Sequence, residues 1–219
     1  MPRHAILPER PYLAPLKPLD SAVTTQQRLP NGQLVLTIEH ATLRALAPPM
    51  LRWWFENIGG TMRHQGRTWP RYLLWHPRDH IHWELAAPAP GGGARQGARF
   101  HIVEAFDARP EWSVDSTEWV EKLDDTGIAL VRRIFGHEIF RLEHRFGEAA
   151  GGASYRSRMV VGTASGWFKP LFNGWVQPQV FSDAMGSAWL RHNVEEVGLL
   201  EALLPPLYAA RPAAGCTSP

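Results

Sequence analysis

The chain has 219 residues, of which 44% are hydrophobic and 20% are charged, and its formal net charge is +2 at pH 7. This length and composition are typical of one globular domain with a sizeable core, and they exclude a disordered chain. The small net charge and the lack of clustered Lys or Arg argue against a nucleic-acid partner. The ten Trp residues favour either an aromatic-lined cavity or a Trp-rich core.

The first 30 residues are rich in proline and aperiodic, which predicts an extended arm over residues 1–30. This region lacks the apolar core of a signal peptide, and no stretch of the sequence approaches the ~18 apolar residues of a membrane span. The single cysteine, Cys216, stands in a Pro/Ala/Gly tail and has no intrachain partner for a disulfide. We therefore expect a cytoplasmic protein without a membrane partner, and a disordered tail over residues 209–219.

The elements that follow the arm are mainly strands. Residues 33–39 alternate like a strand, and residues 40–57 have helical spacing that Pro48-Pro49 must break or restart. Turn-forming sequences separate seven further predicted strands: 71–76, 80–86, 99–107, 112–122, 127–135, 137–146 and 154–162. Residues 166–181 are aromatic and irregular, with room for a short helix.

The last predicted element is a long helix over residues 183–203, capped by Ser182 or Asp183 and ended by Pro205-Pro206. A run of antiparallel strands closed by one long C-terminal helix is an α+β arrangement. A curved antiparallel sheet wrapped around such a helix is the helix-grip fold, whose cavity suits an apolar ligand. With no internal repeat, residues 31–208 are expected to form one helix-grip metal-binding domain.

One face of the 183–203 helix is apolar except at its centre, where two polar residues interrupt it. This face consists of Met185, Trp189, His192, Glu196, Leu199 and Leu203. Because His192 and Glu196 stand one turn apart, their side chains reach the same spot. An unpaired buried carboxylate is strongly unfavourable, so a cation should meet it. A metal ion meets this need, and a buried His–Glu hydrogen bond is the alternative.

Two predicted strands contain similar anomalies. Glu104 stands in the apolar row of its strand, and His76 stands in the apolar row of residues 71–76. Two His and two carboxylates can complete a Zn²⁺ site, with water as a further ligand. Because a proline disturbs the chain after His76, the HPRDHIH segment also offers His80 or His82 as the first ligand.

Two more polar residues stand in apolar rows, His144 in the 137–146 strand and Tyr155 in the 154–162 strand. A His and a Tyr that face a metal-holding cavity are candidates for acid and base catalysis. An ordinary core histidine and a buried structural tyrosine are the alternatives.

Several segments together resemble a known family: MLRWWF, YLLWHPRDH, the strand with Glu104, the pair LEHRF and YRSRMVVG, and RHNVEE. They are similar to the diacetylphloroglucinol hydrolase family, which includes phloretin hydrolase, over about residues 45–205. The resemblance implies a Bet v1/START-like helix-grip fold. It also implies a zinc ion held by a His, a Glu and a His-x-x-x-Glu pair on the last helix. The reaction it implies is hydrolysis of the carbon–carbon bond between an acyl group and a phenolic ring.

Carried over by motif, the resemblance implies the metal ligands His76, Glu104, His192 and Glu196. It also implies a substrate-facing Asp79 and a cavity lined by His144 and Tyr155. We expect His144 and Tyr155 to transfer protons or contact oxygens, and Asp79 and His80 to orient substrate or water. The spacing from the first His to Glu104 is shorter than the family pattern, which leaves the choice between His76 and His80 open.

The expected partner is a small aromatic acyl-phenol substrate. Protonation of its ring carbon would let water attack the acyl carbonyl while the ring departs as a stabilised enolate. Two other functions stay open, a non-catalytic helix-grip carrier of an apolar aromatic ligand and a metal-dependent oxygenase using Fe(II). A plain carrier has no use for four metal ligands, and a second carboxylate closes the site more than an oxygenase needs. The sequence leaves the oligomeric state open, a homodimer included.

Overall fold

The computed structural model describes residues 5–211, so residues 212–219 of the predicted tail, with Cys216, lie outside the described residues. One antiparallel sheet of nine strands dominates the fold, in the order β1-β2-β11-β10-β9-β8-β7-β6, with β3 also paired to β11. Its strands are β1 (Ala22–Arg28), β2 (Leu34–His40), β3 (Leu43–Arg44), β6 (His80–Ala87), β7 (Arg99–Ala105), β8 (Ser113–Asp124), β9 (Gly127–Ile134), β10 (His137–Ala149) and β11 (Gly152–Val161). A separate hairpin is formed by β4 (Thr61–His64) and β5 (Arg67–Pro70).

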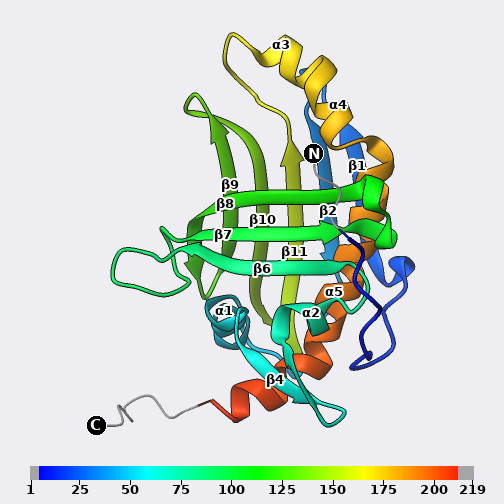
Figure 1. Cartoon of the computed structure of the whole chain (residues 1–219), viewed down its shortest axis with the longest axis vertical. Coiled ribbons are helices and arrows are strands. Elements are labelled where there is room, and N and C mark those ends of the chain that lie inside the picture. The colour runs from blue at the N-terminus through cyan, green and yellow to red at the C-terminus, as the bar shows by residue number, and fades with distance from the viewer. Residues whose placement is uncertain (1–4, 212–219) are drawn as a thin grey trace.

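The helices lie inside the curved sheet and at its two ends (Figure 1). Their bounds are α1 (Pro48–Asn57), α2 (Arg71–Trp75), α3 (Lys169–Leu171), η4 (Phe172–Val176), α4 (Gln177–Val180) and α5 (Asp183–Ala209), and the 3₁₀ turns are η1 (Leu19–Ser21), η2 (Phe106–Ala108) and η3 (Pro110–Trp112). In Figure 1, α1 and α2 lie at one end of the sheet, and α3 and α4 lie at the other. The long helix α5 packs against β1, β2 and β3 and against η2 and α2. This is the α+β helix-grip fold that the sequence predicts.

Two apolar clusters meet along α5. The first joins Trp54 and Trp75 to Leu200, and the second joins Phe106 to Trp189. Because other elements surround α5, its middle part is buried on nearly every side. The sequence favoured either a Trp-rich core or an aromatic-lined cavity, and both are present. Trp54 and Trp75 lie in the core, and Trp189 lines a cavity. Among the described residues, no helix is long and apolar enough to cross a bilayer.

The predicted strand at residues 71–76 is wrong, because Arg71–Trp75 form the short helix α2. The alternation that placed His76 on an apolar strand face therefore does not exist, and His76 instead follows the last residue of α2. The predicted helix over residues 40–57 begins only at Pro48, where a proline is favourable in the first turn. Before it, Leu43–Arg44 form β3.

The two ends of the predicted domain also differ from the sequence interpretation. β1 lies within the predicted N-terminal arm, and it pairs along its whole length with β2. At the other end, α5 continues through Pro205 and Pro206 to Ala209, so the proline pair does not end the helix. The helix persists because Leu203, Leu204 and Leu207 of this region pack against the core. Its start is as predicted, since the Ser182 hydroxyl accepts the Met185 N–H at 3.2 Å.

Candidate metal centre

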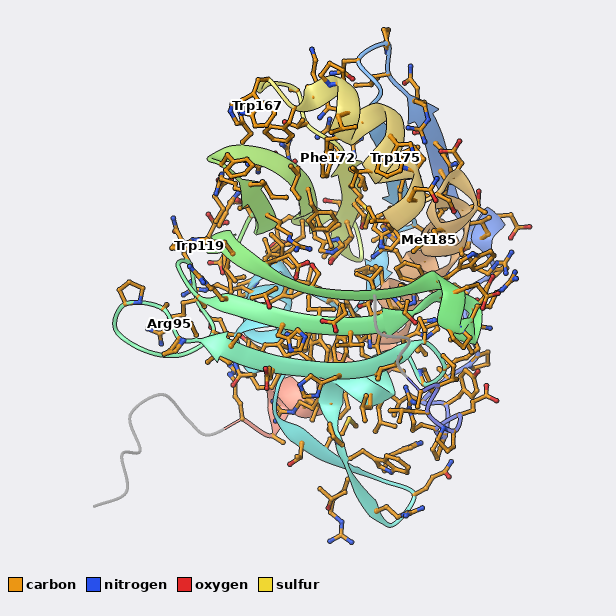
Figure 2. The ribbon with its side chains drawn as sticks, turned by 45° about the horizontal axis from the view of Figure 1, so that its top comes forward. Arg95, Trp119, Trp167, Phe172, Trp175 and Met185 are labelled. Carbon is orange, nitrogen blue, oxygen red and sulfur yellow. The ribbon has the colours of Figure 1, made fainter. Side chains whose placement is uncertain are left out.

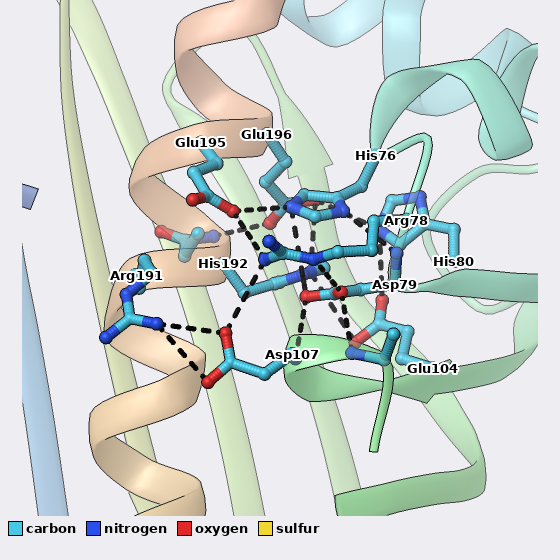
Figure 3. A network of polar contacts seen from close by, with 12 residues as sticks. His76, Arg78, Asp79, His80, Glu104, Asp107, Arg191, His192, Glu195 and Glu196 are labelled. Carbon is cyan, nitrogen blue, oxygen red and sulfur yellow. Dashed lines mark hydrogen bonds and ion pairs between the residues drawn. The ribbon is translucent and has the colours of Figure 1, made fainter. Parts of the chain in front are cut away.

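Four ionisable side chains from three elements converge in the interior (Figure 3). His80 begins β6 and stands directly opposite Glu104 of β7, while His192 and Glu196 lie one turn apart on α5. His80 Nε2 lies 3.5 Å from Glu104 Oε1 and 3.4 Å from Glu196 Oε2. His192 Nε2 lies 3.8 Å from an oxygen of each of the same two carboxylates. The two imidazoles and two carboxylates therefore point at a common space.

Both imidazoles present a nitrogen without a hydrogen-bond partner to that space. Nε2 of His80 and Nε2 of His192 are buried and make no hydrogen bond within residues 5–211. The other nitrogen of each ring is held: His80 Nδ1 lies 2.7 Å from the Tyr72 carbonyl, and His192 Nδ1 lies 3.1 Å from Asp79 Oδ2. Since a carbonyl and a carboxylate only accept, each Nδ1 carries a proton, and the neutral form of each ring has its lone pair on Nε2. That is the form in which histidine binds a metal.

Each carboxylate is also oriented by a neighbour. Tyr72 donates its hydroxyl to Glu104, and its ring stacks on the His80 ring with centroids 3.9 Å apart. Asn193 Nδ2 donates to Glu196 Oε1 at 2.6 Å. These contacts leave Glu104 Oε2 and Glu196 Oε2 facing the imidazoles. The donor set therefore fits a divalent metal, and His80, His192 and Glu196 form one of the buried clusters that could hold an ion.

Electrostatics within the cluster also favour a bound cation. Burial raises the pKa of Glu196 to about 7 and lowers that of His80 to about 3. For His192, burial alone would lower the pKa, but Glu196, the hydrogen bond to Asp79 and Glu104 together raise it to about 9. A proton on His192 and a metal ion at its Nε2 are therefore competing ways to balance the same carboxylates.

His76, the preferred first ligand from the sequence, has both ring nitrogens engaged elsewhere. The Asp79 backbone N–H donates to His76 Nδ1 at 3.1 Å, so Nε2 carries the ring proton. That Nε2 donates to Glu195 Oε2 at 2.9 Å. The geometry thus favours His80, the alternative that the sequence left open. His76 does not reach Glu104 because Arg71–Trp75 form the helical turn α2 instead of a strand, which directs the His76 ring toward Glu195.

Asp79 supports the centre instead of facing the substrate space. It is fully buried and lines neither cavity beside the centre. Besides His192, it accepts hydrogen bonds from Arg78 Nε at 2.8 Å and from the backbone N–H groups of Asp107 and Ala108 at 3.2 and 3.1 Å. Both of these η2 residues have φ of 53°, a left-handed conformation that turns their amides toward Asp79. Its interactions with His192, His76 and Arg78 outweigh burial and hold the pKa of Asp79 far below its usual range.

Arg10 holds the segment that connects α2 to β6, and sequence reasoning missed it. The side chain is buried, and its guanidinium donates to the carbonyl oxygens of Leu73, His76 and His80. These three carbonyls are 63 to 70 residues away from Arg10 in sequence. A fourth acceptor, the Pro8 carbonyl, is local. Its sequence position in a proline-rich arm gave no signal of this role.

Two adjoining cavities lie beside the centre, between the sheet and α5. The larger has a volume of about 140 Å³ and the smaller about 50 Å³, and Glu104 and Trp189 line both. The larger one extends toward the α3–α4 segment, which contributes Phe172 to its lining, and Figure 2 shows Phe172 on this segment above β8. Most of the lining is apolar, so the space suits an aromatic ligand whose reacting end reaches the four converging side chains.

His144 lines the smaller cavity, whereas Tyr155 lines neither cavity. Both face inward from their strands as predicted, and His144 lines the smaller cavity with Glu104 and Glu196. Burial lowers the pKa of His144 to about 3, so its ring is neutral at pH 7. Tyr155 is buried with its ring centroid 5.4 Å from that of His144, and it lines neither cavity.

A hydroxyl bridge links His144 to a second histidine. Ser157 Oγ lies 3.0 Å from His144 Nδ1 and 3.1 Å from His40 Nε2. A serine hydroxyl can accept from one ring and donate to the other, so it couples the tautomers of the two histidines. Sequence reasoning missed this bridge, because Ser157 and His40 come from β11 and β2, far apart in sequence.

The sequence matches the family model of the DAPG hydrolase PhiG domain over residues 20–209. The chain belongs to this family. The match covers every strand of the main sheet, the four converging residues and the whole of α5. It identifies a hydrolase domain of the kind named for diacetylphloroglucinol, as the sequence resemblance implied. No curated protein sequence matches the chain.

Among solved structures, the di-domain ARO/CYC protein BexL from the BE-7585A biosynthetic pathway is similar with a TM-score of 0.51 at 10% identity, covering 84% of this chain and 52% of that chain. At this identity the likeness concerns the fold alone. A protein from Rhodobacter sphaeroides matches with a TM-score of 0.46 at 11% identity, over 86% of this chain and 100% of that chain. Ara h 8.0201 matches with a TM-score of 0.43 at 14% identity, over 76% and 98% of the two chains.

Proposed function

We propose that the chain is a zinc-dependent hydrolase that cleaves the carbon–carbon bond between an acyl group and a phenolic ring of the phloroglucinol type. The observation that carries this proposal is the pair of unpartnered imidazole nitrogens, on His80 and His192, that face two carboxylates beside an apolar cavity. Membership of the DAPG hydrolase family supports the reaction type.

The proposed ligands are His80, Glu104, His192 and Glu196. Two His and two carboxylates are ligand types that zinc accepts, and the hydrogen bonds from Tyr72 and Asn193 orient the carboxylates toward the imidazoles. When bound, zinc would polarise the acyl carbonyl or lower the pKa of a water molecule. Two negative carboxylates in the ligand set would moderate that acidity.

The remaining chemistry falls to the residues of the cavity. An aryl–acyl bond breaks only after the ring carbon gains a proton, because a free aryl carbanion is a poor leaving group. We assign that proton transfer to His144, since it lines the smaller cavity together with Glu104 and Glu196. Because its ring is neutral, His144 would first accept the proton of a substrate hydroxyl and then pass it to the ring carbon, which forms the keto tautomer. Tyr155 packs against the His144 ring, so we assign it to positioning. The apolar walls hold the ring and limit the access of water to it.

The two rival functions are less consistent with these observations. A carrier of aromatic ligands does not need four ionisable groups at one point. Their burial without a bound cation would lower the free energy of unfolding. An Fe(II) oxygenase uses two His and one carboxylate with open positions, whereas this centre has a second carboxylate, Glu196 or Glu104, facing the same space.

Elemental analysis of the purified protein, followed by a screen of acylphloroglucinols for release of the free acid, tests the proposal. We expect one zinc per chain and acid release. Iron with oxygen consumption would favour the oxygenase, and a metal-free protein that binds the ligands without cleaving them would favour the carrier. The Thr117→Val variant, which is changed on the outer face of β8, is the control, because any metal that it lacks was lost during purification.

A further inference from the structure

A second buried carboxyl group, that of Glu118, lies in the larger cavity apart from the four converging side chains. Only 4% of Glu118 is exposed, and its side chain lines the cavity with apolar residues from β10 and β11 such as Phe140, Leu142 and Met159. The Ser116 hydroxyl donates to Glu118 Oε1, while Oε2 is buried without a hydrogen-bond partner among the described residues. One polar atom is therefore left facing an apolar space.

The position of Glu118 on β8 explains why it points inward. The inward-facing row of this strand contains Ser116, Glu118 and Val120, and Val120 is fully buried in the core. On the other face, Thr117 and Trp119 are exposed. A one-residue shift in the pairing of β8 would turn Glu118 toward water. The pairing that forms instead buries this carboxyl group.

The carboxyl group is suited to a neutral polar partner. Burial, followed by the nearby charge of Glu104, raises the pKa of Glu118 to about 8, so the group is mainly protonated at pH 7. A protonated carboxyl both donates and accepts hydrogen bonds, as a phenolic hydroxyl does. The positive charge of Arg132, at the cavity wall, acts in the opposite direction and lowers the pKa of Glu118.

The cavity is of a size that admits an aromatic ring. Its volume of about 140 Å³ is comparable to the ~150 Å³ of an apolar cavity that takes up benzene. Glu104 lines the same cavity, so a ring held there has the candidate metal centre on one side and Glu118 on β8 on another. A ligand with a polar group on the ring would satisfy the unpartnered oxygen, whereas a purely apolar ligand would not.

We propose that Glu118 is the polar anchor of the ligand cavity, which selects aromatic ligands with a ring hydroxyl placed away from the acyl group. The naming of the ligand as a polyphenol rests on the proposed function. The anchor itself rests on the buried, half-satisfied carboxyl in an apolar cavity. Glu118 thereby gives the site a means to discriminate hydroxylated rings from plain ones, because a site built to pair with a hydroxyl rejects a ligand that lacks it.

The test measures binding without turnover, using phloroglucinol, which has no acyl group to lose, and toluene, which has no hydroxyl. Affinities of the purified, metal-loaded protein are measured by calorimetry for the wild type and for the Glu118→Leu, Glu118→Gln and Thr117→Val variants. We expect Glu118→Leu to lower the affinity for phloroglucinol about tenfold and to leave that for toluene unchanged or higher. Glu118→Gln, which keeps a donor and an acceptor, should bind phloroglucinol within about threefold of the wild type, as should Thr117→Val.

Melting temperatures of the same preparations separate an anchor from a structural residue. Removal of a half-satisfied buried carboxyl should leave the melting temperature of Glu118→Leu equal to that of the wild type or higher, as at other sites where function opposes stability. The inference is overturned if Glu118→Leu binds phloroglucinol as the wild type does, if it loses both ligands equally, or if the wild type binds no phloroglucinol. If the anchor effect is found but no acylphloroglucinol is cleaved, the proposed function fails and the anchor stands.

Discussion

His192 Nδ1 lies 3.1 Å from Asp79 Oδ2, and neither side chain reaches solvent. This contact fixes the His192 ring so that its other nitrogen faces Glu104 and Glu196. A carboxylate behind a histidine in this way both orients the ring and makes it a stronger ligand. The relationship therefore ties the η2 turn, which holds Asp79, to the properties of the candidate metal centre.

Asp79→Asn is expected to weaken zinc binding without removing a ligand. An amide in place of the carboxylate can still accept the Nδ1 proton but carries no charge, so zinc affinity should fall by ~10–100-fold. Competition with a fluorescent chelator measures this change. Glu111→Gln, at an exposed position outside the centre, is the matched control. An unchanged zinc affinity in Asp79→Asn would show that the carboxylate does not act on the metal through His192.

His80→Ala should empty the metal centre, and His76→Ala should not. His80 directs an unpartnered nitrogen at the carboxylates, whereas both nitrogens of His76 are hydrogen-bonded to Asp79 and Glu195. The His76 variant should instead lose ~1–3 kcal/mol of unfolding free energy, because Glu195 loses a buried donor. Zinc content and denaturant unfolding of both variants decide the matter. Full zinc in His80→Ala with none in His76→Ala would reverse the assignment.

Zinc affinity should rise with pH between about 7 and 9. The pKa of His192 is raised to about 9, so at pH 7 the ring is protonated and zinc must displace that proton. Lowering the pH therefore favours the competing proton, and each unit of pH rise in this window should increase the affinity about tenfold until His192 is neutral. Titrations in three buffers of different ionisation enthalpy would count the released protons. A flat affinity over this range would mean that His192 is not a ligand.

His144→Ala and Ser157→Ala test the proton-transfer role of His144. The first should retain zinc and fold while kcat for an acylphloroglucinol falls by ~10²–10⁴-fold, the usual contribution of a positioned acid or base. Ser157→Ala should give a smaller fall and a shifted pH profile, because it removes the hydroxyl that bridges His144 and His40. Ser157→Thr, which keeps the hydroxyl, should recover most of the activity. A zinc-loaded and fully active His144→Ala would end the proposed role.

The sequence predicts those parts of the centre whose pattern is local. His192 and Glu196 are recognisable because a four-residue spacing interrupts an apolar helix face, and Glu104 is recognisable because it interrupts an apolar strand row. His80 could not be chosen over His76, because the apolar YLLW segment has no feature that separates one helical turn from a short strand. The choice depends on β4, whose Thr61 carbonyl accepts a hydrogen bond from Arg71 of α2, and on Arg10, which donates to the carbonyls around His76 and His80.

Other site residues escape sequence reasoning because their roles depend on distant partners. Tyr72 contacts Glu104 and stacks on His80, yet its sequence position indicates only a core tyrosine. Glu118 stands in a strand with polar residues on both faces, so alternation could not show which face is buried. The register of β8 against β7 and β9 sets that face, and it is a property of the whole sheet.

Acid release as a function of zinc content tests the central claim most directly. Metal-free protein is titrated with zinc, and the release of free acid from an acylphloroglucinol is measured at each point. We predict no release without zinc, a linear rise with added zinc, and a plateau at one zinc per chain, with the His80→Ala variant inactive throughout. Equal acid release from the metal-free protein, or a protein that holds one zinc per chain and releases no acid from any acylphloroglucinol, would contradict the account.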